Sequence, residues 1–143
     1  MARIKLDLPD KFSFITTISI RITDLNYAGH VGNDTILSLL HEARIQFLQH
    51  HGYEEMKLES CGLIMSDVCI EFKTELFYGD IVEASVTAAD FTRVGFDLYY
   101  KLEKKTDGKK ILAAVAKTGM VCYNYDAKKI ASVPANVRMK LSA

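Results

Sequence analysis

Apolar and polar residues alternate along most of the chain in a way that predicts β-strands. Between residues 12 and 23, Ile18, Ile20 and Ile22 alternate with polar side chains, and this period of two indicates a strand with one buried face. The same alternation returns over residues 67–73, 82–88, 94–103 and 111–123. We therefore expect one strand near the N-terminus and four in succession later in the chain.

The predicted strands are separated by turn sequences. Tyr78-Gly79-Asp80 predicts a turn, and Asp107-Gly108 predicts a tight hairpin because both residue types tolerate the positive φ angles that such a turn needs. Short connections of this kind join antiparallel strands. After a further turn at residues 124–128, Pro134 is placed to begin a short helix that ends near Leu141.

Residues 33–52 have helical rather than strand periodicity. We expect Asn33 or Asp34 to cap the N-terminus of this helix and Gly52 to end it. A helix with so wide an apolar face needs a sheet around it, or a sheet and a partner subunit. Its main apolar face is formed by Ile36, Leu39, Leu40, Ala43 and Phe47.

The order of elements is one strand, one long helix and then a run of antiparallel strands. This order predicts an α+β fold in which the helix packs on one face of the sheet, and the length of 143 residues predicts a single domain over residues 1–143. One helix cannot cover both edges of such a sheet. We therefore expect a homo-oligomer.

The composition of the chain argues against several classes of function. Eighteen basic and eighteen acidic residues cancel, and no basic block is present, which argues against a nucleic-acid partner. No apolar window is long enough to span a bilayer, and the N-terminus lacks the apolar run of a signal peptide. Cys61, Cys69 and Cys122 are scattered, as expected for buried free thiols in the cytoplasm.

The loop of residues 24–32 carries the candidate chemistry. It is polar, contains Gly29 and Gly32, and leads into the N-terminus of the long helix, where backbone amides are unpaired and carry a partial positive charge. A reaction that develops negative charge on a carbonyl oxygen needs such donors. We expect the amides of Val31, Gly32 and Asn33 to supply them.

Three groups compete for the role of base. We rank His30 first, because histidine suits proton transfer near neutral pH, then Glu42 on the helix, then Asp24. Each also has a structural interpretation: His30 as a loop anchor, Glu42 as a surface acid, and Asp24 as a turn residue or a partner of Arg21. His41-Glu42 begins a zinc-binding HExxH motif, but residue 45 is isoleucine, so we expect no metal.

Three stretches of the sequence match the pattern of a known family: Arg21-x-x-Asp24-x-Asn26-x-x-Gly29-His30-Val31-x-Asn33, Glu42-Ala43-Arg44 and Phe77-Tyr78-Gly79-Asp80-x-Val82. Through these motifs the chain resembles the hotdog-fold thioesterases of the 4-hydroxybenzoyl-CoA and acyl-ACP thioesterase kind. This resemblance implies one long helix wrapped by a curved antiparallel sheet of five to six strands. It implies hydrolysis of an acyl-CoA or acyl carrier protein thioester at subunit interfaces of a dimer or dimer of dimers, without a cofactor.

The sequence departs from the family pattern at the position of the catalytic carboxylate. That position is Asn26, and an amide can orient water or the thioester but cannot take a proton from water. Ala28 stands where the acyl-ACP thioesterases have an asparagine. We expect the remaining site to combine catalytic groups from Asn26, His30, Glu42 and Asp24 with substrate contacts from Gly29, Val31, Gly32 and Asn33.

Two other functions fit parts of the same sequence. Hotdog-fold hydratases carry Asp-x-Asn-Pro-x-His, and Asp24-Leu25-Asn26 begins in this way, although Tyr27 replaces the proline and His30 lies one residue late. A non-catalytic acyl-CoA binding protein would explain the missing carboxylate. The sequence leaves open the acyl group and the choice between CoA and carrier protein.

Overall fold

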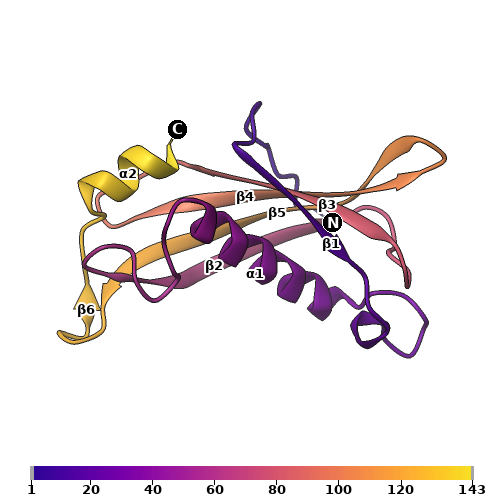
Figure 1. Ribbon diagram of the computed structural model, residues 1–143, viewed down its shortest axis with the longest axis horizontal. Helices are drawn as coiled ribbons and strands as arrows, with labels where there is room; N and C mark the ends of the chain where they lie inside the picture. Colours follow the sequence, from indigo (N-terminus) through magenta and orange to yellow (C-terminus); the bar gives the residue numbers. More distant parts are fainter. Residues whose placement is uncertain (1, 143) are drawn as a thin grey trace.

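The computed structural model describes residues 2–142 and contains a sheet, two α-helices and one turn of 3₁₀-helix (Figure 1). No helix in this range is long and apolar enough to cross a membrane. The elements, in chain order, are β1 (Phe14–Ser19), η1 (Ile22–Asp24), α1 (Asn33–His50), β2 (Gly62–Phe72), β3 (Ile81–Ala89), β4 (Gly95–Thr106), β5 (Lys109–Asn124), β6 (Lys129–Ile130) and α2 (Ala135–Leu141).

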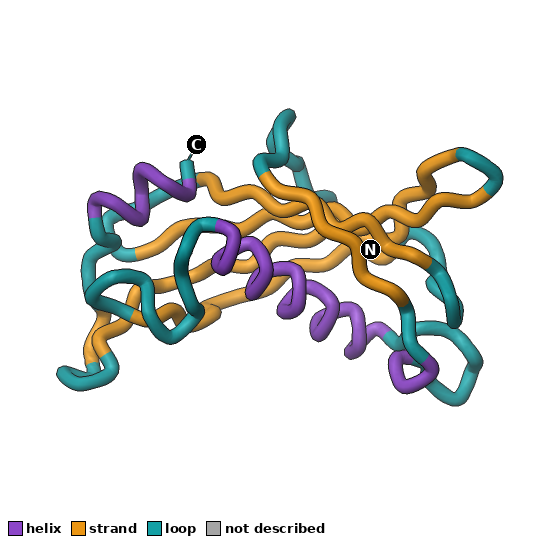
Figure 2. The backbone as a smooth tube through the Cα atoms, viewed as in Figure 1, coloured by secondary structure: helices purple, strands orange, loops and turns teal. Residues whose placement is uncertain are grey.

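The six strands form one antiparallel sheet in the order β1-β3-β4-β5-β2, with β6 paired to β5. The sheet arches over α1, as Figure 2 shows. The expected α+β hotdog architecture is therefore confirmed. In this order the long strand β2 is an edge strand, and it has no neighbour on its outer side within residues 2–142.

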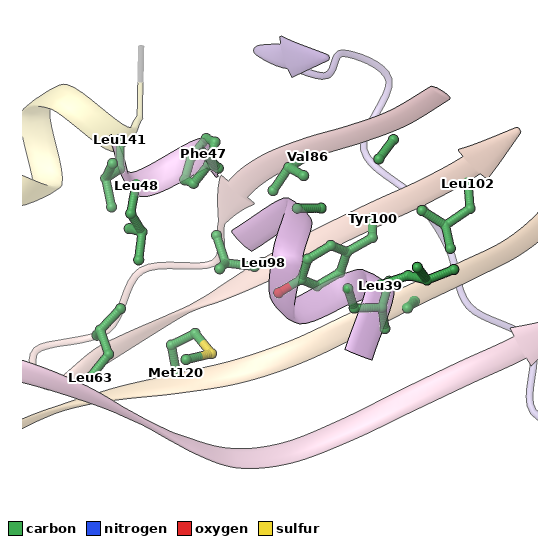
Figure 3. Close-up of a cluster of buried hydrophobic side chains, with 14 of the residues drawn as sticks. Leu39, Phe47, Leu48, Leu63, Val86, Leu98, Tyr100, Leu102, Met120 and Leu141 are labelled. Carbon is green, nitrogen blue, oxygen red and sulfur yellow. The ribbon is translucent and has the colours of Figure 1, made fainter. Parts of the chain in front are cut away.

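The core lies between α1 and the concave face of the sheet. Leu40, Ala43 and Phe47 of α1 are fully buried, and Ala114 and Ala116 of β5 leave the space that the helix occupies. Figure 3 shows this cluster, with the hydroxyl of Tyr100 directed toward α1. The short helix α2 closes one end of the core by burying Val137 and Leu141, the latter near Leu48 in the same view.

The start of α1 differs from the prediction. The N-cap residue is Gly32, in extended conformation and without a side-chain cap, so the prediction that Asn33 or Asp34 caps the helix is wrong. A hydrogen bond from the Val31 N–H to the Leu76 carbonyl (2.9 Å) holds the chain extended up to Gly32. Asn33 and Asp34 therefore become the first two helical residues.

The end of α1 agrees with the prediction. Gly52 has a φ of +83°, and its N–H donates to the Gln49 carbonyl (2.9 Å), while the Tyr53 N–H donates to Leu48 (2.8 Å). These two bonds form the Schellman arrangement that ends a helix. The predicted hairpin turn is also confirmed, because Asp107 and Gly108 have φ angles of 52° and 75°.

Two strand boundaries were predicted incorrectly. The first strand ends at Ser19 rather than residue 23, because the Asp24 carboxylate accepts the Arg21 N–H (2.8 Å) and helps to close the turn η1. Ile22 is consequently 66% exposed rather than buried. Strand β2 begins at Gly62, well before the predicted start at residue 67, since its first half is paired with β5 despite a weak alternation.

The N-terminal arm, residues 2–13, crosses the face of the sheet that points away from α1. The Leu6 N–H donates to Glu71 on β2 (2.6 Å), and Lys101 on β4 lies 5.0 Å from the centre of the Phe12 ring. Both partners point outward, because they alternate with side chains that face the helix. The arm thus covers part of the face of the sheet that points away from α1, and the sequence analysis did not predict this contact.

Candidate active site

A hollow of about 220 Å³ lies between the start of α1 and the end of β2. His30, Lys73 and Glu75 supply titratable groups, and most of the remaining wall is apolar. The lining residues are His30, Val31, Asn33, Ile36, Phe72, Lys73, Thr74, Glu75, Leu76 and Ala113. An apolar hollow with a few polar groups is the usual form of a small-molecule site.

His30 is held between two contacts. Its Nδ1 lies 3.1 Å from the carbonyl oxygen of Val31, and its Nε2 lies 3.8 Å from Oε1 of Glu75. The carbonyl can only accept, so Nδ1 carries the proton in the neutral ring and Nε2 is left with a lone pair. With 27% of its side chain exposed, His30 can accept a proton from water in the hollow.

Asn26 and Gly29 shape the loop that carries His30. The Asn26 N–H donates to the His30 carbonyl (2.9 Å), and the Gly29 N–H donates to the Asn26 carbonyl (3.1 Å). The side-chain oxygen of Asn26 accepts the Ala28 N–H (2.9 Å), so it serves the turn. Gly29 has a φ of +84°, which suits glycine. Neither Asn26 nor Gly29 lines the hollow.

The amides at the start of α1 are only partly available. The Val31 N–H donates to Leu76, so the expectation that this amide is free for a substrate is wrong. The antiparallel bridge between Leu25 and Val31 directs the Gly32 N–H at the Asp24 carbonyl. The N–H groups of Asn33 and Asp34 donate to no acceptor within residues 2–142. Two free donors at a helix N-terminus can stabilise a developing oxyanion.

The carboxylates of Asp24 and Glu42 form hydrogen bonds with other residues and not with His30. Asp24 is buried and accepts the N–H and the guanidinium (3.3 Å) of Arg21, which matches the alternative of a turn residue paired with Arg21. Glu42 is exposed on α1 and accepts a bond from Gln46 (2.6 Å). Within one subunit, neither carboxylate lines the hollow.

Glu75 is the site residue that the sequence reasoning missed. It follows β2 in the segment whose Leu76 carbonyl pairs with Val31, and this pairing brings it opposite His30. The only signal in the sequence is an acidic residue between a strand and the Phe77-Tyr78-Gly79-Asp80 turn. That signal does not reveal a pairing with a loop so far away in the chain.

A buried polar network fixes α1 against the sheet. Nε of Arg44 donates to Glu55 (2.6 Å), its Nη1 donates to the Tyr100 hydroxyl (3.2 Å), and that hydroxyl lies 2.7 Å from Thr118 Oγ1. Burial opposes the charge of Arg44, but Tyr100 and Glu55 hold its pKa above the ordinary value. This network positions the helix whose first turn borders the hollow.

Comparison with known proteins identifies the family. Residues 20–141 match the family model described as the thioesterase-like superfamily. The chain belongs to this family, and thioester hydrolysis is the general reaction class that membership supports.

Solved structures share the fold at low sequence identity. A 4-hydroxybenzoyl-CoA thioesterase, with one aspartate replaced by asparagine and 4-hydroxybenzoyl-CoA bound, superposes with a TM-score of 0.83 at 18% identity, covering 90% of this chain and 98% of its own. A 1,4-dihydroxy-2-naphthoyl-CoA thioesterase from Synechocystis gives 0.79 at 21%, covering 90% and 94%. A thioesterase superfamily protein from Jannaschia gives 0.80 at 17%, covering 93% and 83%. At these identities the likeness shows the fold alone.

Proposed function

We propose that this protein hydrolyses the thioester of an acyl-CoA in the hollow beside His30. The observation that carries the proposal is the meeting of three features at one place: the free amides at the start of α1, the imidazole of His30, and an apolar wall. Thioester hydrolysis needs a polarised carbonyl, an activated water and space for the acyl group.

The proposed reaction proceeds in two steps. Nε2 of His30 takes a proton from water as the water oxygen attacks the thioester carbon. The carbonyl oxygen becomes an oxyanion bound by the free amides of Asn33 and Asp34. The oxyanion then collapses and breaks the carbon–sulfur bond, and the imidazolium returns its proton to the CoA thiolate. Glu75 faces the ring edge that becomes charged and stabilises the imidazolium.

Asn26 has a positioning role in this proposal. Its side-chain oxygen supports the turn, which leaves its amide nitrogen as a donor near Gly32, 3.5 Å from where a β-carbon at Gly32 would lie. The amide N–H can orient water or the carbonyl but cannot act as the base. We therefore assign proton transfer to His30.

The acyl group is proposed to enter the apolar part of the hollow, formed by Val31, Ile36, Phe72, Leu76 and Ala113. Two of the solved relatives are named for aromatic CoA thioesters, which supports testing a compact aromatic acyl group first. The three cysteines are free thiols, which fits a reducing compartment, so we propose a cytoplasmic enzyme.

We further propose that β2 pairs with β2 of a second copy. Its edge is unpaired along eleven residues, and Met65, Val68 and Phe72 are 40%, 41% and 50% exposed. An exposed apolar edge strand is a template for pairing with another chain. Because Phe72 also lines the hollow, a second copy would cover the site.

A hydrolysis assay tests the proposed activity. Benzoyl, short-chain and long-chain acyl-CoA esters are incubated with the protein, and released CoA is measured with a thiol reagent. The proposal predicts catalytic release of CoA from at least one ester. A folded protein that binds acyl-CoA by calorimetry and leaves every ester intact would instead be the non-catalytic binder.

A further inference from the structure

Strand β5 contains a β-bulge at Ala113, beside the hollow of the candidate site. On β4, Leu102 pairs with Ala114 and the next residue, Glu103, pairs with Leu112, so Ala113 has no partner on β4. An extra residue of this kind bends its strand and changes the direction of nearby side chains, and bulges are frequent next to active sites. The bulge therefore calls for an account of what Ala113 does in the hollow.

The bulge places two successive alanines on the side of the sheet that faces α1. Leu102 is fully buried on that side, and its partner Ala114 lies there too, because residues paired across two strands share a face. Glu103 follows Leu102 and points to the opposite side, and so does its partner Leu112. Ala113 alternates with Leu112, so it also faces α1. It is 2% exposed and lines the hollow.

The backbone of Ala113 is fixed relative to the proposed base. Its carbonyl oxygen accepts the N–H groups of Lys73 (2.9 Å) and Thr74 (3.2 Å), the two residues that follow β2. The next residue is Glu75, whose carboxylate lies 3.8 Å from Nε2 of His30. These contacts join position 113 to the segment that faces His30, so its side chain has a defined place in the hollow.

We propose that Ala113 limits the size of the acyl group, an inference that rests on the proposed function. Ala113 is the smallest of the apolar residues around the hollow, whose volume is about 220 Å³. A larger side chain at this position would extend into the space that the acyl group occupies, because hydrogen bonds hold the backbone of the bulge. Compact acyl groups, such as benzoyl, are therefore the class of substrate that the hollow selects.

The test measures kcat/KM for acetyl-CoA, benzoyl-CoA and 2-naphthoyl-CoA. In Ala113→Leu the longer side chain competes with the benzoyl ring, so the ratio of kcat/KM for acetyl-CoA to that for benzoyl-CoA should rise by about tenfold or more. In Ala113→Gly the space of one methyl group opens, so the ratio for 2-naphthoyl-CoA to benzoyl-CoA should rise by about tenfold. Ala88→Leu changes a partly buried alanine outside the hollow and should leave both ratios unchanged.

The outcomes separate this inference from the proposed function. Each ratio comes from one preparation, so partial unfolding cancels. An unchanged acetyl to benzoyl ratio in Ala113→Leu, or an equal change in Ala88→Leu, would overturn the role of Ala113 while leaving the hydrolase intact. If Ala113→Leu does not fold, the naphthoyl to benzoyl ratio of Ala113→Gly decides, and an unchanged ratio overturns the inference.

If the wild type hydrolyses no ester, the proposed function fails, and calorimetry with acetyl-CoA and benzoyl-CoA decides the role of Ala113 instead. A greater loss of affinity for benzoyl-CoA than for acetyl-CoA in Ala113→Leu supports the inference. Equal losses for the two esters overturn it.

Discussion

Nε2 of His30 lies 3.8 Å from Oε1 of Glu75, on the side of the ring opposite to the contact between Nδ1 and the Val31 carbonyl. The two residues come from segments joined by the hydrogen bond between the Val31 N–H and Leu76. The ring orientation is therefore set by the same backbone pairing that places α1 on the sheet.

Replacing His30 by alanine should remove the base. We expect kcat to fall by about 10²–10³-fold with KM changed less than about threefold, the pattern for a group that acts in the transition state. His30 is not in the hydrophobic core, so the thermal midpoint should stay close to that of the wild type. Steady-state kinetics and a melting curve check both points; an unchanged kcat would remove His30 from the mechanism.

Glu75→Gln tests the positioning of that base. The substitution keeps the shape of the side chain but removes the charge that stabilises the imidazolium. Because Glu75 is exposed and solvent screens the pair, we expect kcat to fall by about two- to fivefold, with KM unchanged. Glu54→Gln, at another exposed glutamate, is the control. A loss shared by both variants would show a general charge effect instead.

Asn26→Asp should preserve or raise activity. An aspartate retains the oxygen that accepts the Ala28 N–H and adds a proton acceptor at the position where the family pattern has one. The kcat of Asn26→Asp is compared with that of Asn26→Ala, which loses the turn contact and should be the slower variant. An inactive Asn26→Asp protein would show that the site depends on the amide N–H.

Asp67 and Asp97 both lie near Lys117, and they should change the stability of the protein with pH in opposite directions. The bond from Lys117 to Asp67 (2.7 Å) lowers the pKa of Asp67, whereas burial raises the pKa of Asp97, whose carboxylate is 4.0 Å from Lys117. Asp67 thus stabilises the folded protein at pH values above its ordinary pKa of 3.8. This stability is lost as the pH falls through the lower pKa that Asp67 has in the folded protein. Asp97 has the opposite effect: the folded protein loses stability as the pH rises from 3.8 through the higher pKa that Asp97 has in the folded protein.

Asp97→Asn should therefore raise the free energy of unfolding at pH 7, by less than about 1 kcal/mol because solvent screens the pair. The gain should disappear in acid, below pH 3.8. Asp67→Asn should lower stability at pH 7 and also converge with wild type in acid. Urea unfolding at several pH values measures both; the same sign for the two variants at pH 7 would contradict this account.

Val68→Lys tests the proposed pairing of β2. A charge at this exposed position in the middle of the edge strand should prevent association, so the protein should elute as a monomer with reduced activity. Ile15→Lys places a charge on the other edge strand, β1, and should leave the oligomer intact. If the wild type is itself a monomer in size-exclusion chromatography, the pairing proposal fails.

Periodicity predicted the parts of the fold whose burial alternates regularly. The long helix, its end at Gly52 and the hairpin at Asp107-Gly108 are all local features, and each is present. The first half of β2 was not predicted, because several exposed residues follow one another there and the alternation is lost. This segment is a strand because it pairs with β5.

The candidate site was predictable only in part. The loop with His30 and the helix start were evident, because a polar glycine-containing loop before an apolar helix is a local pattern. The occupied amide of Val31 and the partner Glu75 both depend on contacts between distant segments. Such contacts follow from the folded arrangement and not from spacing along the chain.

A crystal structure with a non-hydrolysable ketone analogue of an accepted acyl-CoA, in which a methylene separates the carbonyl from the sulfur, tests the central claim most directly. The account predicts a carbonyl oxygen about 3 Å from the amide nitrogens of Asn33 or Asp34, with water between Nε2 of His30 and the carbonyl carbon. An analogue whose carbonyl lies elsewhere, with these amides facing only solvent, would contradict it.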